Sequence, residues 1–557
     1  MPHEHEHPER PLLLHERPDV HRRRWLLLGV MCASLVLVVM AVTSLNVAAP
    51  RLQQELGTTA SQLHWIIDSY ALVFAGLLLS AGALGDRFGR KGALLVGLGV
   101  FAVGLTVAGL AGSAGQVIAG RAVMGVGGAF VMPATLSLIT AVFPPHERGR
   151  AIAVWAAFAG AGGAVGPVVA GLLLESYWWG SALLADLPVV AVAAVAVAAL
   201  APRSRDSRAT PLDVVGSGLA LLAMVSLLFG IIESAERGWT DGLVLGAFAG
   251  AALVGGAFVG WEARARHPML PLDLFRDRRF SLASAVITVT FLCMFGFYFL
   301  STLYLQYVLG YSPLEAGLAG LPTAAAMIVA SPRSARLAER HGPGAVMAGG
   351  FGLMAVALAV FTLVGTATPY PVLAAGFVAI GAGMASTTAT ATALLMSAVP
   401  LDKAGVGSAV NDTTREFGGA LGIAVLGTLV GSVYRSGFEP AAADLAAGAV
   451  GASAIEAARE SIGAAWGAAA AAGHDGGRLL AEAQSAFVAA FNVTSGVTLA
   501  VTVSAGALVW AVRRSVGASA GAGDAEAAEA EGGTPDVADA APPPADRPEP
   551  TSTPAEA

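Results

Sequence analysis

The sequence is poor in charged residues, lysine and cysteine, and each scarcity narrows the class of protein. Charged residues make up only 13% of the 557 residues, 55% are hydrophobic, and the mean hydropathy is +0.68. A soluble protein of this length needs a more polar surface, so a soluble globular fold is excluded. The two cysteines, Cys32 and Cys293, both fall inside long apolar runs, so no disulfide framework is expected.

The motifs of several enzyme classes are also missing. The sequence contains no H-E-x-x-H metal motif, no phosphate-binding P-loop, and no Cys/His set in any loop. The segments between the apolar runs on the predicted cytoplasmic side are too short to house a catalytic domain. We therefore expect no enzyme activity, no metal, no cofactor and no nucleic-acid partner.

Long apolar runs dominate the chain. A helix crosses a bilayer with about 20 apolar residues, and fourteen runs approach or exceed that length. They lie at 25–49, 64–84, 93–112, 116–139, 150–173, 181–201, 212–232, 243–262, 281–308, 315–335, 344–365, 371–397, 405–432 and 486–512. The sequence thus predicts an all-α membrane protein with fourteen spans.

The lysines and arginines are distributed unevenly between the two sides of the predicted membrane. Alternate loops place 25 of them on the side of the N-terminus and five on the other side, and only Arg121 and Arg415 fall within spans. Because positively charged loops stay on the cytoplasmic side, both termini are predicted to be cytoplasmic in the cell membrane.

A dense charged turn lies between the second and third spans, and a second copy of it lies half a protein further on. The candidate gating residues of the first copy are Gly82, Asp86, Arg87, Gly89, Arg90 and Lys91, with Asp86 expected to face the three basic residues at ion-pairing distance. At an offset of 253 residues the pattern recurs as Leu337, Glu339, Arg340 and Gly342. This repeat predicts a duplicated helical unit. The alternative is a basic loop that only fixes topology.

The repeat and the span count together predict two six-helix halves separated by an extra pair of helices. The predicted segments are an N-terminal tail 1–24, a first half 25–201, the extra pair with its loops 202–280, a second half 281–512 with an outward insertion 433–485, and an acidic, Pro-rich tail 513–557. The insertion is expected either to be partly helical, on the membrane surface or over the outer mouth, or to be a loose loop. The final tail is expected to be disordered.

Ionisable residues inside spans are costly in lipid, so they are functional candidates. Asp68 follows Trp65-Ile-Ile, and burial would let its carboxylate exchange a proton for a cation; the alternative is a hydrated acid at the outer mouth. Arg121, in the fourth span, is a functional candidate for the same reason; the alternative is a structural role in which it bonds loop carbonyls near the outer end. The role of Asp186 stays open.

A second group of charges lies near the start of the thirteenth span. Asp412 and Glu416 are four residues apart on one helical face, with Arg415 beside them. A buried acid pair can hold a proton or a cationic compound. Alternatively, Arg415 neutralises the acids and the group only fixes the position of the helix.

The fifth span carries small residues and a proline at helical spacing. The glycines provide a face for close packing and the proline bends the helix, so bending can change which side is open. Generic packing of small residues is the alternative. The residues of this motif are Gly162, Gly166, Pro167 and Gly171.

These motifs resemble those of a known family. The run from Gly82 to Lys91, G-x-L-x-D-R-x-G-R-K, resembles the signature loop of the major facilitator superfamily, and Arg121 with Gly125 resembles its R-x-x-x-G pattern. The glycine motif of the fifth span resembles the superfamily's antiporter signature, and W-I-I-D-S-Y around Asp68 is similar to a W-I-V-D-x-Y stretch of quaternary-ammonium exporters. Over residues 25–515 the chain is identified as a member of the fourteen-helix drug:proton antiporter family.

The resemblance implies a function and a set of partners. Members export amphipathic organic compounds by alternating access, with a proton gradient in place of a cofactor, and Arg121 would take part in proton coupling. We expect a monomer in the lipid bilayer. Ala41 stands where the family has an Asp, which weakens any expectation of dicationic substrates. The alternative is an uptake porter or facilitator of the same fold. A non-transporting receptor is a further class, but it would give the charged residues inside the spans no function.

Overall fold

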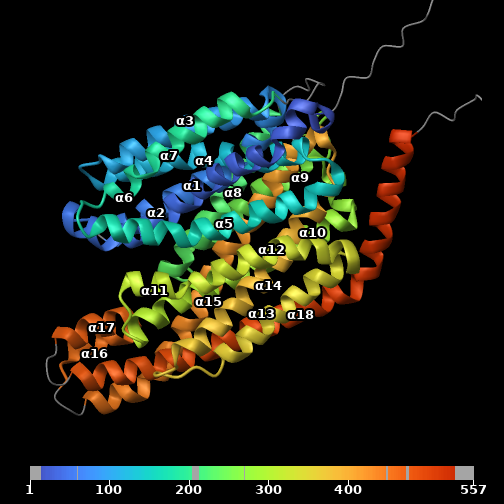
Figure 1. Cartoon of the computed structure of the whole chain (residues 1–557). Helices are drawn as coiled ribbons and strands as arrows, with labels where there is room; N and C mark the ends of the chain where they lie inside the picture. Colours follow the sequence, from blue (N-terminus) through green and yellow to red (C-terminus); the bar gives the residue numbers. More distant parts are fainter. Residues whose placement is uncertain are drawn as a thin grey trace, which may run out of the picture.

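The computed structural model describes residues 14–58, 60–203, 213–268, 270–446, 450–471 and 476–532, and within these ranges all regular structure is helical. Fourteen helical segments are long and apolar enough to cross a membrane. Each overlaps one of the predicted spans, so the all-α fold with fourteen spans is confirmed. Figure 1 shows the helices as one elongated bundle.

The first half of the bundle consists of six spans. Its elements are η1 (Leu14–Glu16), α1 (Pro18–Leu56), α2 (Ala60–Phe88), α3 (Arg90–Gly109), α4 (Ala114–Val142), α5 (Pro145–Leu174), and a sixth span made of α6 (Ser181–Leu184) and α7 (Asp186–Leu200). Helix α1 begins before the predicted boundary at residue 25, because Pro18 suits the first helical position and the basic cluster at 22–24 continues the helix. Residues 1–13 lie outside the described residues.

The second half also consists of six spans. Its elements are η2 (Leu272–Arg276), α10 (Arg278–Leu303) with the π-helical turn η3 (Tyr304–Val308), α11 (Pro313–Ala319), α12 (Leu321–His341), α13 (Pro343–Phe361), α14 (Tyr370–Ser397), η4 (Leu401–Lys403), α15 (Ala404–Ala446) and α18 (Gly476–Gly532). Its helices pair as those of the first half do: α10 with α15 as α1 with α5, and α12 with α14 as α2 with α4. The predicted duplication is therefore present in the packing.

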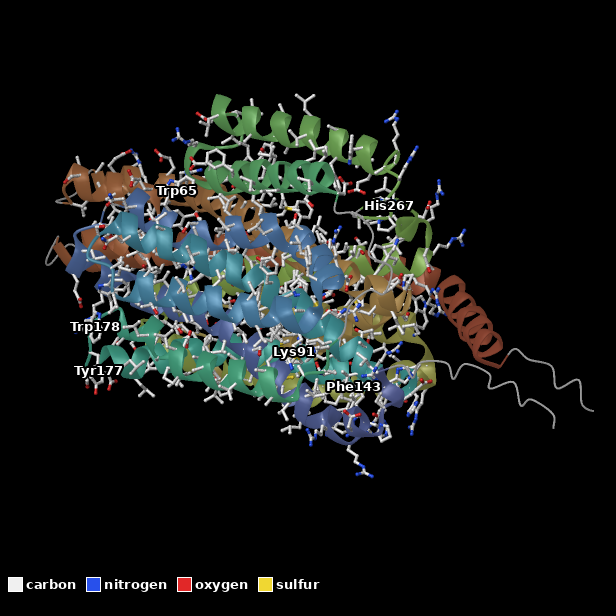
Figure 2. All side chains as sticks on the ribbon, turned by 90° about the horizontal axis from the view of Figure 1, so that it is seen from above. Trp65, Lys91, Phe143, Tyr177, Trp178 and His267 are labelled. Carbon is white, nitrogen blue, oxygen red and sulfur yellow. The ribbon has the colours of Figure 1, made fainter. Side chains whose placement is uncertain are left out.

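The two halves meet along two seams. Helix α2 packs against α15 along one seam, and α5 packs against α12 along the other. In both cases the second helix of one half meets the fifth helix of the other, which gives the molecule an approximate twofold symmetry. Following the predicted topology, we call the end where α1 and α15 begin the inner end and the opposite end the outer end. Figure 2 shows Trp65, Tyr177 and Trp178 toward the outer end and Phe143 and His267 toward the inner end.

The extra pair consists of α8 (Val214–Arg237) and α9 (Gly242–Glu262). Asp213 and Asp241 precede these helices, and their carboxylates accept hydrogen bonds from the backbone N–H groups of Gly216 and Leu243, at 2.7 and 2.9 Å. Such caps satisfy donors that a helix start leaves free. Helix α8 packs against α9 and contacts both α2 and α15. The pair forms one edge of the molecule (Figure 2).

The predicted insertion is largely helical in its described residues. Helices α15 and α18 extend into it, and α16 (Ala452–Glu460) and α17 (Ile462–Ala471) lie between them at the outer end (Figure 1). The Tyr434 hydroxyl donates to the Ala458 carbonyl at 2.6 Å, and the Trp466 ring lies 6.1 Å from that of Tyr307. These contacts attach the insertion to the second half, which favours the helical alternative over a loose loop.

The start of the predicted disordered tail is helical. Helix α18 does not stop near residue 512 but continues to Gly532. The reason is compositional, since the segment after Arg514 is rich in alanine, the strongest helix former, and contains no proline before Pro535. Residues 533–557 lie outside the described residues.

Candidate functional site

The charged turn between α2 and α3 is a single glycine. Helix α2 ends at Phe88, α3 begins at Arg90, and Gly89 between them has a φ of 111°, a region that favours glycine. The second copy behaves in the same way, since Gly342 joins α12 to α13 with a φ of 83°. The repeat seen in the sequence therefore corresponds to two equivalent helix junctions.

Asp86 joins the inner ends of the two halves. The residue is only 6% exposed, and one carboxylate oxygen accepts a hydrogen bond from Arg90 at 2.9 Å. The other oxygen accepts from the backbone N–H groups of Gly405 and Val406, at 2.8 and 3.1 Å, in the first turn of α15. A carboxylate at a helix N-terminus also interacts favourably with the helix dipole. Arg90 donates to the Leu401 carbonyl at 2.6 Å, which adds a second link between the halves.

Lys91, the last basic residue of the turn, has a different partner from the one predicted. Lys91 donates to the Ala198 carbonyl of α7 at 2.7 Å, whereas the described ion pair of Asp86 is with Arg90. The Arg87 guanidinium lies 5.3 Å from the centre of the Phe88 ring. The predicted network around Asp86 is thus wrong for Lys91 and holds for Arg90.

Gly82 lets α2 and α15 come into close contact at the same place. A Cβ atom on Gly82 would lie 2.5 Å from the Gly405 carbonyl oxygen, and one on Gly405 would lie 2.6 Å from that of Gly82. In the second copy Glu339 and Arg340 are exposed. The first copy is therefore a contact between the halves, while the charges of the second lie at the surface.

Arg121 is buried completely within the first half. Its guanidinium donates to the backbone carbonyls of Ile66, Ile67 and Ala41, at 3.1, 3.3 and 3.3 Å, and lies 4.6 Å from the centre of the Tyr70 ring. Arg121 thus connects α4 to both α1 and α2. The carbonyl that it contacts on α1 belongs to Ala41, which stands where the family that this sequence resembles has an Asp.

Asp68 lies half-buried beside this arginine. Among the described residues no basic side chain forms an ion pair with it, although Arg121 and Glu233 are both within electrostatic range. Tyr70, two residues further along α2, is within electrostatic range of Glu416 on α15. Tyr70 therefore links Arg121 to the second half.

The second-half group is organised around Asp412, whose side chain is 1% exposed. One carboxylate oxygen accepts from Asn411 at 3.0 Å and lies 3.8 Å from Arg415, while the other has no hydrogen-bond partner among the described residues. Asn411 accepts in turn from the Thr392 hydroxyl at 2.8 Å. Glu416 interacts electrostatically with both Asp412 and Arg415. The structure thus brings the three predicted residues together.

Arg415 also reaches the first half. Its guanidinium lies 4.7 Å from the centre of the Phe291 ring and 5.6 Å from that of Trp155, which belongs to α5. The Trp155 indole is held by a hydrogen bond to the Thr135 hydroxyl at 3.2 Å. Sequence reasoning missed Trp155, because nothing in its surrounding apolar sequence distinguishes it from a core residue.

The glycine motif of α5 has two faces. On one face, Gly162 and Gly166 pack against α1: a Cβ on Gly162 would lie 3.1 Å from that of Val39, and one on Gly166 would clash with the Thr43 hydroxyl. The Gly166 carbonyl also accepts from Ser44 at 3.2 Å. The motif therefore needs small residues for packing inside the first half.

The other face of α5 meets the second half. A Cβ on Gly171 would lie 3.3 Å from Leu314, and one on Gly317 would lie 3.6 Å from Pro167. Both partners belong to α11, at the outer end. The antiporter-like motif thus lies in the outer part of the seam between the halves.

Asp186 is fully buried at the start of α7, and neither of its carboxylate oxygens has a hydrogen-bond partner among the described residues. Helix α7 packs against α1 and α3, within the first half. Asp186 therefore belongs to neither charged group. Within the described residues no three His, Cys, Asp or Glu side chains gather closely enough to hold a metal ion.

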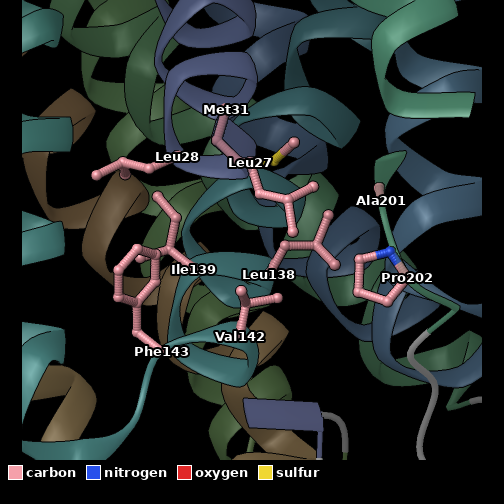
Figure 3. Close-up of a pocket in the computed structure, with 9 residues that line it drawn as sticks. All are labelled: Leu27, Leu28, Met31, Leu138, Ile139, Val142, Phe143, Ala201 and Pro202. Carbon is pink, nitrogen blue, oxygen red and sulfur yellow. The ribbon is translucent and has the colours of Figure 1, made fainter. Parts of the chain in front are cut away.

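A pocket near the inner end of the first half has a different character. Side chains from α1, from α4 and from the segment after α7 line it, and all are apolar (Figure 3). Its lining residues are Leu27, Leu28, Met31, Leu138, Ile139, Val142, Phe143, Ala201 and Pro202. None of the charged residues described above lines this pocket.

Comparison with known proteins identifies the family. The family model of the Major Facilitator Superfamily matches residues 31–423. The chain is 35% identical over 74% of its length to 82% of the multidrug efflux pump LfrA of Mycolicibacterium smegmatis. It is 33% identical over 88% of its length to 92% of the tetracenomycin C resistance and export protein of Streptomyces glaucescens. The chain therefore belongs to the Major Facilitator Superfamily.

Further comparisons agree with this assignment. The methyl viologen resistance protein SmvA of Salmonella typhimurium is 34% identical over 74% of the chain and 84% of its own length. The human organic anion transporter MFSD10 (TETRAN) shares the fold, with a TM-score of 0.55 and 16% identity over 87% of the chain and all of that structure. The protein is thus a multi-pass membrane transporter of small molecules and not an enzyme.

Proposed function

We propose that the protein is a proton-coupled exporter of amphipathic organic compounds across the cytoplasmic membrane. The observation that carries the proposal is the approach of two groups of charges inside the spans at the seam: Tyr70 lies against Arg121 of the first half and within electrostatic range of Glu416, which accompanies Asp412 and Arg415 in the second half. Charges in a span are retained where they bind ions or substrates. The relatives' names, which describe drug efflux and resistance, support export.

The two groups suit different tasks. Asp68 has no ion-pair partner among the described residues, so its carboxyl group is available to take up and release a proton. Asp412 lies 3.8 Å from Arg415, and its second carboxylate oxygen has no hydrogen-bond partner among the described residues, so that oxygen is available to a cation. Arg121, held by hydrogen bonds to three backbone carbonyls, places a positive charge near Asp68.

The contacts between the halves supply the means for alternating access. The Asp86 contact with α15 closes the inner end, and the α5 motif packs on α11 at the outer end. Opening either side requires breaking one set of contacts while the other is kept. We propose cytoplasmic termini and a monomeric unit, since the described halves complete both seams within one chain.

The test is transport in everted membrane vesicles with an imposed pH gradient, acid inside. Expression of the chain should drive accumulation of an amphipathic dye in these vesicles, and dissipating the gradient should abolish it. Uptake into intact cells with the same dye would support the importer alternative instead. Vesicles that show no gradient-dependent movement in either direction would contradict the proposal.

A further inference from the structure

Arg415 lies against two aromatic rings that belong to different halves. Its guanidinium carbon is 4.7 Å from the centre of the Phe291 ring on α10 and 5.6 Å from that of the Trp155 ring on α5. A cation is attracted to the face of an aromatic ring over distances up to about 6 Å. Trp155 and Phe291, which we call the ring pair, thus hold one positive charge between the two halves.

The ring pair lies at the depth of a substrate site. Helices α5, α10 and α15 all begin at the inner end, and the ring pair and Arg415 stand about three turns after these starts. At about 5.4 Å per turn, they lie about 16 Å from the inner end, toward the middle of the membrane. Transporters built from two repeats bind their substrates near that depth, between the repeats.

Trp155 presents the face of its ring and not its polar group. Its indole N–H donates to the Thr135 hydroxyl of α4 at 3.2 Å, and that hydroxyl donates to the Met132 carbonyl at 2.8 Å. The N–H is the one polar group of indole, and it is satisfied within the first half. The ring face, the best aromatic partner for a cation, is left for the charge.

Arg415 is held less firmly than Arg121, the other arginine inside a span. Arg121 donates to three backbone carbonyls, whereas Arg415 lies 3.8 Å from the Asp412 carboxylate, too far for a hydrogen bond. The second carboxylate oxygen of Asp412 is buried without a hydrogen-bond partner among the described residues, which is unfavourable until a donor or a cation approaches. Another cation can therefore take the place of Arg415, and Glu416 is near enough to attract the displaced guanidinium.

We propose that the ring pair binds the positively charged group of a substrate, and that Arg415 is its tethered occupant while the inner end is closed. When the halves part at the inner end, Trp155 moves away from Arg415 with the first half and its ring face is released. An organic cation then binds the ring pair beside the second oxygen of Asp412. Return of Arg415 to the rings as the inner end closes displaces the cation. The inference rests on the proposed function for the class of ligand.

The test measures binding to the purified full chain in lipid nanodiscs, with tetraphenylphosphonium as the cation and triphenylphosphine oxide as its neutral analogue. Arg415→Met should tighten cation binding about fivefold, because it removes the tethered charge and keeps an unbranched side chain. Trp155→Leu and Phe291→Leu should each weaken it about fivefold, the effect of one cation–π contact, and binding of the neutral analogue should change by less than about twofold.

Double variants separate competition for the rings from repulsion between charges. If Arg415 competes for the ring pair, Arg415→Met should tighten cation binding by less than about twofold once Trp155→Leu or Phe291→Leu has removed a ring. If Arg415 only repels the cation through space, the full gain persists in both double variants, and the inference is overturned. Where Trp155→Leu does not fold, the Phe291→Leu background decides.

Arg150→Met is the matched control, because the Arg150 guanidinium lies 4.9 Å from the centre of the Trp25 ring, a contact within the first half near the inner end. It removes the same charge from a ring and should leave both affinities unchanged. Unchanged or weaker cation binding in Arg415→Met, equal changes for both probes, or a wild-type protein that binds neither would overturn the inference. Gradient-driven efflux by the wild type in vesicles tests the proposed function separately, since a chain that binds the cation as expected and exports nothing keeps the site and loses that function.

Discussion

One carboxylate oxygen of Asp86 accepts a hydrogen bond from the backbone N–H of Gly405 at 2.8 Å, across 319 residues of sequence. Asp86 ends the second span of the first half, and Gly405 begins the fifth span of the second half. Because the acceptor is charged and buried, this contact contributes about 2 kcal/mol to the conformation with a closed inner end. The turn therefore influences the equilibrium between conformations with a closed and an open inner end.

Asp86→Asn should therefore abolish transport while the protein reaches the membrane at near-normal abundance. Loss of the charge weakens the hydrogen bonds to α15 and Arg90, and the closed conformation loses a factor of about thirty in population. The measurement is gradient-driven dye transport in vesicles, normalised to protein by immunoblot. Glu339→Gln is the control and should be milder, because Glu339 is exposed in the second copy. A variant that is merely absent from the membrane would remove support for gating.

Asp68→Asn should lose proton-driven efflux of every substrate. The amide cannot exchange a proton, and among the described residues Asp68 is the carboxylate next to Arg121. Everted vesicles with an imposed pH gradient, assayed with one cationic and one neutral compound, provide the measurement. Vesicles that still couple efflux to the gradient would move the proton site to the second-half group.

Asp412→Asn should damage transport of cationic compounds more than that of neutral ones. Removing this charge leaves Arg415 with Glu416 as its nearby acid and lowers the negative potential that attracts a cation. The same vesicle assay gives the ratio of cationic to neutral efflux, which should fall about five- to tenfold, the effect of one buried charge. An equal loss for both compounds would indicate a role in helix position instead.

Gly166→Ala should reduce transport strongly, while Gly163→Ala should not. The added methyl group at position 166 meets the Thr43 hydroxyl and the Met40 carbonyl on α1, whereas one at position 163 meets nothing within 4 Å. Overpacking of this kind costs about 1–3 kcal/mol. Transport per folded molecule and thermal stability in detergent should fall together for Gly166→Ala. Equal behaviour of the two variants would show that the spacing of small residues is not needed.

Cysteine labelling should confirm the topology. Substitutions at the exposed residues Glu55, Thr240 and Glu460 should react with an impermeant maleimide in intact cells, and one at Asp273 should react only after permeabilisation. The native Cys32 and Cys293 are buried, so the background should be low. Position 206 lies outside the described residues and should behave like Asp273. Labelling of position 206 or Asp273 in intact cells would contradict the fourteen-span arrangement.

The spans and the duplication could be predicted from the sequence. The spans depend on local hydropathy, and the duplication is visible in the repeated glycine junction. The sequence also identified Arg121 and the Asp412 group, since charge inside an apolar run is visible without coordinates. The partners of these residues were not predictable, because they depend on how distant helices pack. The Asp86 contact with Gly405 and the approach of Arg415 to Trp155 both join separate helices.

The length of α15 was also not predictable from hydropathy. The apolar run ends near residue 432, but the alanine-rich segment that follows continues the helix to Ala446. Lys91 shows the same limit at a finer scale. Its neighbours in sequence favoured an ion pair with Asp86, and its position on α3 directs it to a carbonyl of α7 instead.

Helix α15 runs from the Asp86 contact, past Asp412 and Arg415, to the helices of the insertion at the outer end. Between Ala404 and Pro440 it is about 54 Å long, so each degree of tilt about its inner end moves the outer end by about 1 Å. A rod of this kind works as a lever. A macromolecule that bound α16 and α17 from outside would restrict the tilt of α15 and so act on the Asp86 contact at the inner end. It would slow the transport cycle without occupying the substrate path.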